Sequence, residues 1–205
     1  MTDLFTHITD QRNQIADTLE NLTQEQWSTT SLCADWTVQE VAGHLTTGWN
    51  VGLGQFALGL AKARGNFARA NERFGRQLGA RPTDQIVADL RDNAADRFTP
   101  PGTGPEAPLI DCIVHSQDMF IPLDIAYEVD PNTVAFVMDA AVGKKMRRIS
   151  GTTVAERFSL EATDTTWRHD NPGQPLLEGP VLALLLTIFA RTAGHTSLSG
   201  PTQDI

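Results

Sequence analysis

The chain has 205 residues, of which 40% are hydrophobic and 20% charged, a composition typical of a folded globular protein rather than a disordered one. Its net charge of −9 argues against nucleic acid as a partner, because binding to phosphates requires a basic surface. No apolar run reaches the ~20 residues of a membrane span, the N-terminus lacks a signal-peptide pattern, and two cysteines make no disulfide framework. We therefore expect a cytoplasmic monomer or homodimer without nucleic-acid or membrane partners.

The first hundred residues carry mainly helical patterns. Apolar residues recur at helical spacing in successive segments, and polar residues lie between them. The expected helices are 3–22, 37–62, 64–80 and 81–98. Thr37 and Glu40 have the spacing of a capping box at the start of the second helix, and Thr83 or Asp84 is suited to cap the last one.

A further helix is expected over 108–121. The segment 99–108 is rich in Pro and Gly and predicts a loop, and Pro108 suits the first position of a helix. Pro122 then ends or kinks the helix. The residues predicted to face the core are Ile110, Ile113, Val114, Gln117 and Ile121.

The pattern changes after residue 128. A shorter helix is expected in 130–146, a strand or hairpin in 157–170, a loop over 171–180 and an apolar helix over 180–192. The prediction is a mainly α chain, with a helical bundle over 1–127 and a small α+β subdomain over 128–205 packed on it.

The segment DCIVHSQD, residues 111–118, contains the strongest chemical signal. On a helix Asp111 and His115 share one ridge, because residues four apart differ by only about 40° around the axis. A carboxylate and an imidazole so placed can bind one metal ion, and Asp118 can accept a hydrogen bond that orients the imidazole ring. An exposed polar ridge is the commoner explanation of such a pair taken alone.

A third ligand would come from another helix, and His44 in the capped segment is the candidate. His44, Asp111 and His115 together make three protein ligands, the number found in catalytic zinc sites that leave one position open. A lone histidine at the edge of an apolar stripe is, however, more often a structural residue. Catalytic residues beyond this metal site are not apparent from the sequence.

Two other residues have competing interpretations. Cys112 shares a helix face with His115 and could offer a thiolate, but its apolar neighbours favour a small core residue. Arg191 at the end of the last apolar helix complements the helix dipole, or alternatively binds a substrate carboxylate.

Three segments in order carry a resemblance to a known family. CADWTVQEVAGHL (33–45), LIDCIVHSQDMFIPLDI (109–125) and the C-terminal stretch 158–200 with its TDTTW, GP and LSG motifs resemble the mycothiol-dependent maleylpyruvate isomerase group of the DinB-like superfamily. The resemblance implies a four-helix bundle in which His44, Asp111 and His115 hold a divalent metal, usually zinc. It also implies mycothiol, or a similar low-molecular-weight thiol, as co-substrate. The isomerase carries Glu where this chain has Asp111, which is one methylene shorter.

Three functions remain open at this stage. The first is a thiol-dependent metalloenzyme, an isomerase or S-transferase, in which the metal activates a thiolate for addition to a small electrophilic substrate. The second is a non-catalytic metal-binding sensor or interaction bundle. The third is a structural bundle whose polar ridge faces water.

Overall fold

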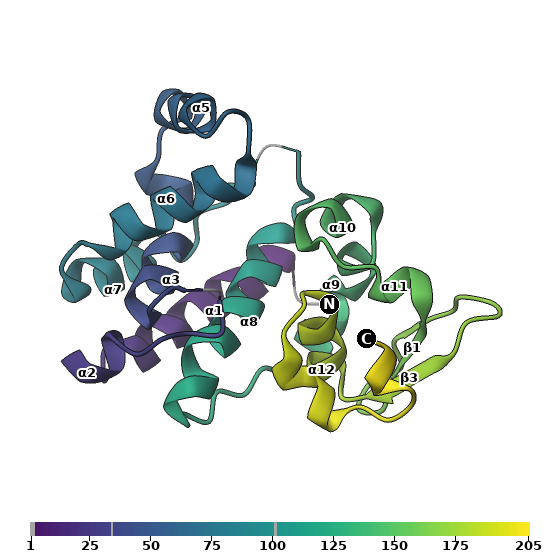
Figure 1. The fold of residues 1–205 in the computed structure, drawn as a ribbon. Coiled ribbons are helices and arrows are strands. Elements are labelled where there is room, and N and C mark those ends of the chain that lie inside the picture. The colour runs from purple at the N-terminus through teal and green to yellow at the C-terminus, as the bar shows by residue number, and fades with distance from the viewer. Residues whose placement is uncertain (1–2, 34, 101) are drawn as a thin grey trace. The chain divides into compact units, whose positions relative to one another are not determined.

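The computed structural model describes residues 3–33, 35–100 and 102–205 and shows a mainly α chain with a small three-stranded sheet, as expected (Figure 1). The chain divides into two compact units. The first contains Met1–Pro100 and Asp111–Tyr127, and the second contains Pro101–Ile110 and Glu128–Ile205. Among the described residues, no helix has the length and apolar character needed to cross a membrane.

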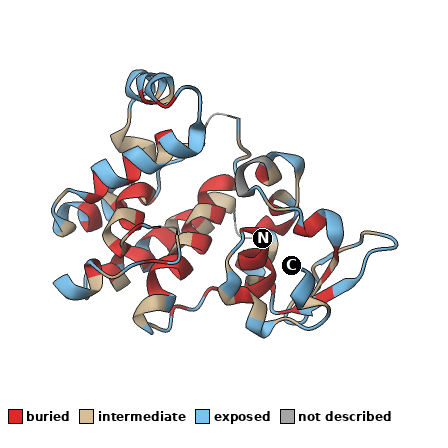
Figure 2. Cartoon of the chain, viewed as in Figure 1, coloured by how far each residue is buried: buried red, intermediate tan, exposed pale blue. Residues whose placement is uncertain are grey.

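The helices of the first unit follow the predicted order. They are α1 (Leu4–Leu19), α2 (Gln24–Trp27), α3 (Val38–Leu45), α4 (Thr47–Asn50), α5 (Leu53–Lys62), α6 (Phe67–Gly79), α7 (Thr83–Asp92) and α8 (Ala107–Phe120), followed by the 3-10 turn η1 (Ile121–Leu123). The first four residues of α8 belong to the second unit and the rest to the first. α1 packs on α7, and α3 packs on α6 over an extensive interface. α1 buries the apolar Ile8, Ile15 and Leu19 almost fully, together with the polar Gln11 and Arg12. Buried residues are coloured red in Figure 2.

The single helix expected over 37–62 is wrong, because the segment is broken into α3, α4 and α5. At the end of α3, threonine hydroxyls donate hydrogen bonds to the carbonyls of its last turn. Thr46 Oγ1 donates to Gly43 O at 2.7 Å and Thr47 Oγ1 donates to His44 O at 2.6 Å. Such local side-chain bonds offer the backbone an alternative to the helical ladder. The break leaves His44 in the last turn of α3.

Two further expectations in this unit are wrong in detail. Pro82, not Thr83 or Asp84, occupies the N-cap of α7, and no side-chain bond caps that helix. Ile121 does not continue the buried stripe of α8, because Pro122 draws the chain into η1 and leaves Ile121 41% exposed.

The second unit combines short helices with the sheet. Its elements are α9 (Pro131–Ala141), α10 (Lys144–Ser150), α11 (Val154–Arg157), β1 (Ser159–Ala162), β2 (Arg168–His169), β3 (Leu176–Gly179), α12 (Val181–Ile188) and the 3-10 turns η2 (Thr192–Ser197) and η3 (Thr202–Asp204). β1 lies between β2, which is antiparallel to it, and β3, which is parallel. The prediction of a loop over 171–180 is therefore wrong for residues 176–179, which form β3.

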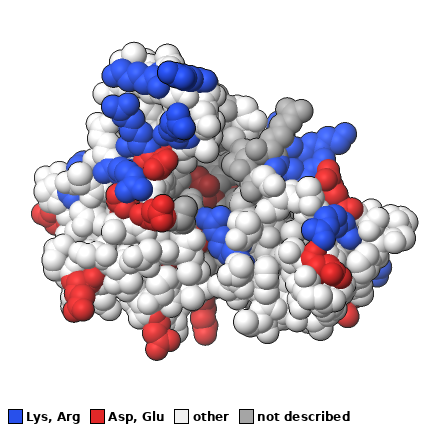
Figure 3. Space-filling model, in the orientation of Figure 1, with Lys and Arg blue, Asp and Glu red and all other residues white. Residues whose placement is uncertain are grey.

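Charge is unevenly distributed despite the acidic total. Figure 3 shows Lys and Arg side chains gathered over α5 and α6. These helices and the turn between them carry Lys62, Arg64, Arg69, Arg73 and Arg76 against one acidic residue, Glu72. The basic side chains of this segment thus form a local feature of an otherwise acidic chain.

Candidate metal centre

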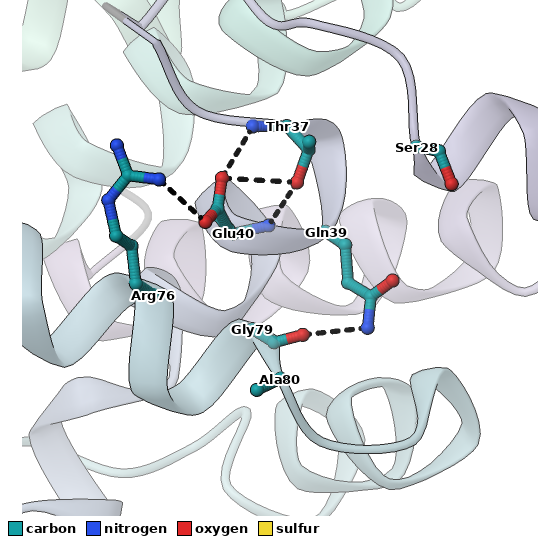
Figure 4. A pocket seen from close by; sticks show the side chains of 7 residues that line it. All are labelled: Ser28, Thr37, Gln39, Glu40, Arg76, Gly79 and Ala80. Carbon is teal, nitrogen blue, oxygen red and sulfur yellow. Dashed lines mark hydrogen bonds and ion pairs between the residues drawn. The ribbon is translucent and has the colours of Figure 1, made fainter.

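His44 is positioned by a helix whose start is strongly fixed. Thr37 Oγ1 accepts a hydrogen bond from Glu40 N at 3.2 Å, and Glu40 Oε2 accepts one from Thr37 N at 2.9 Å, which confirms the predicted capping box. The other carboxylate oxygen of Glu40 lies 3.0 Å from Arg76 Nη1 on α6 (Figure 4). The start of α3 is therefore held by its own capping box and by an ion pair with α6.

The close packing of α3 on α6 depends on two glycines. A Cβ built on Gly43 would lie 2.7 Å from Gly79 Cα, and one built on Gly79 would lie 2.6 Å from Glu40 Cα. Both distances are below any real Cβ contact, so only glycine allows the two backbones to approach this closely. Gly43 directly precedes His44, and its contact fixes the depth at which the imidazole lies.

A shallow pocket beside this contact contains none of the candidate ligands. Its lining residues are Ser28, Thr37, Gln39, Glu40, Arg76, Gly79 and Ala80 (Figure 4). Gln39 Nε2 donates to Gly79 O at 2.7 Å and to Arg81 O at 3.0 Å, so the polar groups here serve the α3–α6 contact.

The structure brings His44, Asp111 and His115 together. One ligand-type atom from each of these residues lies within 4.8 Å of the other two. His44 Nε2 is 4.0 Å from Asp111 Oδ2, and the rings of His44 and His115 meet edge-to-face with centroids 5.0 Å apart. Ligands on one tetrahedral zinc ion lie about 3.4 Å apart, given bonds of ~2.1 Å, so small side-chain rotations would bring these atoms to bonding distance.

The environment keeps His44 neutral. Burial, the largest cause, and the neighbouring His115 lower the pKa of His44 to about 3, although Asp118 acts in the opposite direction. Its side chain is 8% exposed, and its Nδ1 is buried with no hydrogen-bond partner among the described residues. A buried neutral imidazole with a nitrogen left unsatisfied is suited to binding a metal ion.

His115 has the opposite electrostatic environment. Its Nδ1 lies 2.9 Å from Asp118 Oδ2, and the Asp118 side chain is completely buried. Burial alone would lower the pKa of His115, but the contacts with Asp118 and Cys33 together outweigh it and raise the pKa to about 10. The contact with Asp118 is of the kind expected from the sequence, since a carboxylate on one ring nitrogen fixes the ring and leaves the other nitrogen for a ligand.

Cys33 is a neighbour of the cluster that sequence reasoning missed. Its Sγ, a nitrogen of His115 and an oxygen of Asp118 lie within 4.8 Å of one another. The backbone N–H of Leu32 donates to Asp118 O at 2.9 Å, which holds the Cys33 loop against α8. The sequence shows a cysteine eleven residues before His44. Because Cys33 lies in a loop, no helical periodicity relates its position to that of His115.

Cys112 is buried in the core of its unit, with 3% of its surface exposed. Burial, opposed in part by the neighbouring Arg12, raises the pKa of its thiol to about 12. The thiol is thus neutral at ordinary pH. This environment agrees with the prediction that Cys112 packs rather than reacts.

Arg191 does not end the last apolar helix, contrary to expectation. α12 stops at Ile188, and Ala190 takes a left-handed conformation with φ of 61° before Arg191. The Arg191 guanidinium donates to Phe189 O at 2.7 Å, which satisfies a carbonyl at the end of the helix. A substrate-binding role for Arg191 stays a prediction.

We compared the chain and its structure with known protein families and solved structures. Residues 8–108 match the model of the mycothiol maleylpyruvate isomerase N-terminal domain family. The crystal structure of the mycothiol-dependent maleylpyruvate isomerase matches with a TM-score of 0.56 at 10% identity, and that of a histidine-to-alanine mutant of it with 0.55 at 11%. Each match covers 98% of this chain and 93% of the other. A comparison with curated proteins found no match.

The chain is therefore a mainly α protein with a small three-stranded sheet, as expected from the sequence, and it shares the fold of these isomerase structures. The match to the mycothiol maleylpyruvate isomerase N-terminal domain family covers residues 8–108, just under half of the chain. The matched segment includes Cys33 and His44 and ends before Asp111 and His115.

Proposed function

We propose that the protein is a metal-dependent enzyme that uses a small thiol of the mycothiol type to act on a small electrophilic substrate. The reaction is of the maleylpyruvate isomerase kind, or a related transfer of the thiol. The observation that carries the proposal is the convergence of His44, Asp111 and His115 within 4.8 Å, in a chain whose N-terminal half matches this family.

The residues present suit a divalent metal such as zinc. Two imidazoles and one carboxylate are common zinc ligands, and three protein ligands leave a coordination position for an exogenous molecule. The placement of buried His44 supports the same assignment, because its Nε2 lies 4.0 Å from Asp111 Oδ2. A divalent metal bound there would lower the pKa of a coordinating thiol and so supply a thiolate at neutral pH.

The side chains of the cluster would have different roles in metal binding and substrate access. His44 is neutral and ready to ligate without losing a proton. Asp118 orients His115 from the buried side. The Asp111 side chain is 45% exposed, far more than the two histidines, so the thiol and substrate would approach on its side of the cluster.

The test combines metal analysis with turnover. We expect one zinc ion per chain by elemental analysis of the purified protein. The His44→Ala variant should bind zinc at least tenfold more weakly, whereas His7→Ala, a histidine on α1 outside the cluster, should bind it normally. Mycothiol with maleylpyruvate, and with a panel of simple electrophiles, would then be assayed with and without a chelator.

Turnover that requires both thiol and metal would support the proposal. Zinc binding without any thiol-dependent turnover would favour the non-catalytic metal-binding alternative. Equal zinc affinity and equal thiol binding in wild type, His44→Ala and His7→Ala would contradict the role of His44 as a metal ligand.

A further inference from the structure

Cys33 lies in a short segment whose two ends are hydrogen-bonded to each other. Ser31 N donates to Trp36 O at 2.8 Å, and Thr30 and Thr37 form an isolated antiparallel bridge around it. Ser31 Oγ accepts a hydrogen bond from Cys33 N at 3.1 Å. These bonds hold the backbone of Cys33 a few residues before α3 begins at Val38.

The same loop is attached to α8 at the residue that orients His115. Leu32 N donates to the carbonyl of Asp118, while the carboxylate of Asp118 contacts His115 Nδ1. The neighbouring Trp36 ring lies 5.4 Å from the ring of His44. Main-chain hydrogen bonds of Leu32 and Cys33 therefore hold the backbone of partly buried Cys33 near His115.

The resulting group has a ligand chemistry different from that of the first cluster. Cys33 offers sulfur, His115 nitrogen and Asp118 oxygen, and all three atoms lie within 4.8 Å of one another. A thiolate favours soft or borderline ions such as Cd²⁺, Zn²⁺ and Co²⁺, whereas two imidazoles and a carboxylate discriminate less.

The two groups have His115 in common. A neutral imidazole carries one lone pair, because its other nitrogen holds a proton. Occupation of the Cys33 group would also replace the hydrogen bond between His115 Nδ1 and Asp118 that supports the first cluster. One ion bound through His115 thus excludes a second.

We propose that Cys33, His115 and Asp118 form an alternative metal site that competes with the His44, Asp111 and His115 cluster for His115. Each chain holds one ion, and thiophilic ions shift toward the Cys33 site. This inference goes beyond the proposed enzymatic function and requires no substrate.

Cobalt provides the test, because a cysteine thiolate bound to Co²⁺ gives a ligand-to-metal charge-transfer absorption that nitrogen and oxygen ligands do not. Co²⁺ would be titrated under reducing conditions into wild type, Cys33→Ser, His44→Ala and His115→Ala. We expect one Co²⁺ per chain and a thiolate band in wild type. The band should strengthen in His44→Ala, disappear in Cys33→Ser with one ion still bound, and be lost with the ion in His115→Ala.

Cys112→Ala is the matched cysteine control and should keep the wild-type band. Cd²⁺ should bind at least tenfold more weakly to Cys33→Ser than to wild type, and Mn²⁺ about equally. Circular dichroism would confirm folding, and Cys33→Ala would replace a variant that does not fold.

Bound cobalt without a thiolate band in His44→Ala, two ions per chain, or loss of the band in Cys112→Ala would overturn the proposal. None of these results depends on turnover. Failure of the Cys33 site therefore remains distinct from failure of the proposed enzyme, which shows itself as zinc binding without thiol-dependent activity.

Discussion

His115 Nδ1 lies 2.9 Å from the carboxylate of Asp118, a side chain with no exposed surface. This buried contact fixes the orientation of one candidate ligand and its affinity for protons. An Asp118→Asn change keeps the shape but removes the negative charge. We expect zinc affinity to fall by about 10–100-fold, as is usual when the partner of a ligating histidine is lost. A competition titration with a zinc indicator would measure it, and unchanged affinity would show that Asp118 does not support the site.

Metal uptake should depend on pH in a defined direction. Burial lowers the pKa of His115, but its contacts with Asp118 and Cys33 raise it to about 10, so the metal-free form carries a proton that the ion must displace. His44, with a pKa of about 3, has none to lose. Zinc affinity should therefore rise about tenfold per pH unit across neutral pH, with one proton released per ion.

Calorimetry of zinc binding in buffers of different ionisation enthalpy would count that proton. Wild type is compared with the Cys33→Ser variant, because Cys33 is one of the contacts that raise the pKa of His115. The raised pKa of His115 lies above the neutral range, so affinity that does not change between about pH 6.5 and 8.5 would contradict the protonated state of His115.

The glycine contact between α3 and α6 predicts a stability effect linked to the site. Gly43→Ala should destabilise the protein by about 3 kcal/mol, because its Cβ would collide with the backbone of Gly79 and overpack the interface. It should also weaken zinc binding, since His44 is the next residue. Gly54→Ala on exposed α5, where a Cβ meets nothing within 4 Å, should instead stabilise by about 0.5–1 kcal/mol. Urea denaturation of both variants would test the contrast.

Arg12 is a buried cation with a structural role. Its Nη1 donates to the carbonyls of Asn93, Ala94 and Asp96, just beyond the end of α7, and its guanidinium lies over the Trp49 ring. We expect Arg12→Met to cost about 3 kcal/mol, because it removes three hydrogen bonds, of which the one to the Ala94 carbonyl is buried.

The exposed Arg91 is the matched control for Arg12. It pairs with Asp17 and Glu20 at the surface, so Arg91→Met should cost less than about 1 kcal/mol. Thermal unfolding of the two variants provides the comparison. Similar losses would mean that Arg12 contributes no more than a surface ion pair.

The parts of the site that lie on regular helices could be predicted from the sequence. The Thr37–Glu40 capping box placed the start of α3, and helical spacing placed Asp111 and His115 on one ridge. Such features are local, so a short segment determines them. His44 was a candidate from its place in the capped helix, and only the family resemblance linked it to that ridge, because its approach depends on packing between distant segments.

The errors have equally specific causes. The break after Leu45 comes from threonine hydroxyls that compete with the helix, which apolar periodicity does not register. β3 was missed because it has only four residues and is flanked by prolines and glycines, and its parallel pairing with β1 is not local. Cys33 was missed because the bond from Leu32 to Asp118 joins residues far apart in the chain.

The unequal exposure of the three candidate ligands bears on how an ion would be exchanged. The side chains of His44 and His115 are 8% and 12% exposed, whereas that of Asp111 is 45% exposed. An incoming chelator or metal-carrying molecule would reach the ion from the Asp111 side, and the carboxylate bond would be the first to open. The rate of metal loss should thus be set by one short side chain at the edge of the cluster, while the two histidines set how tightly the ion is held.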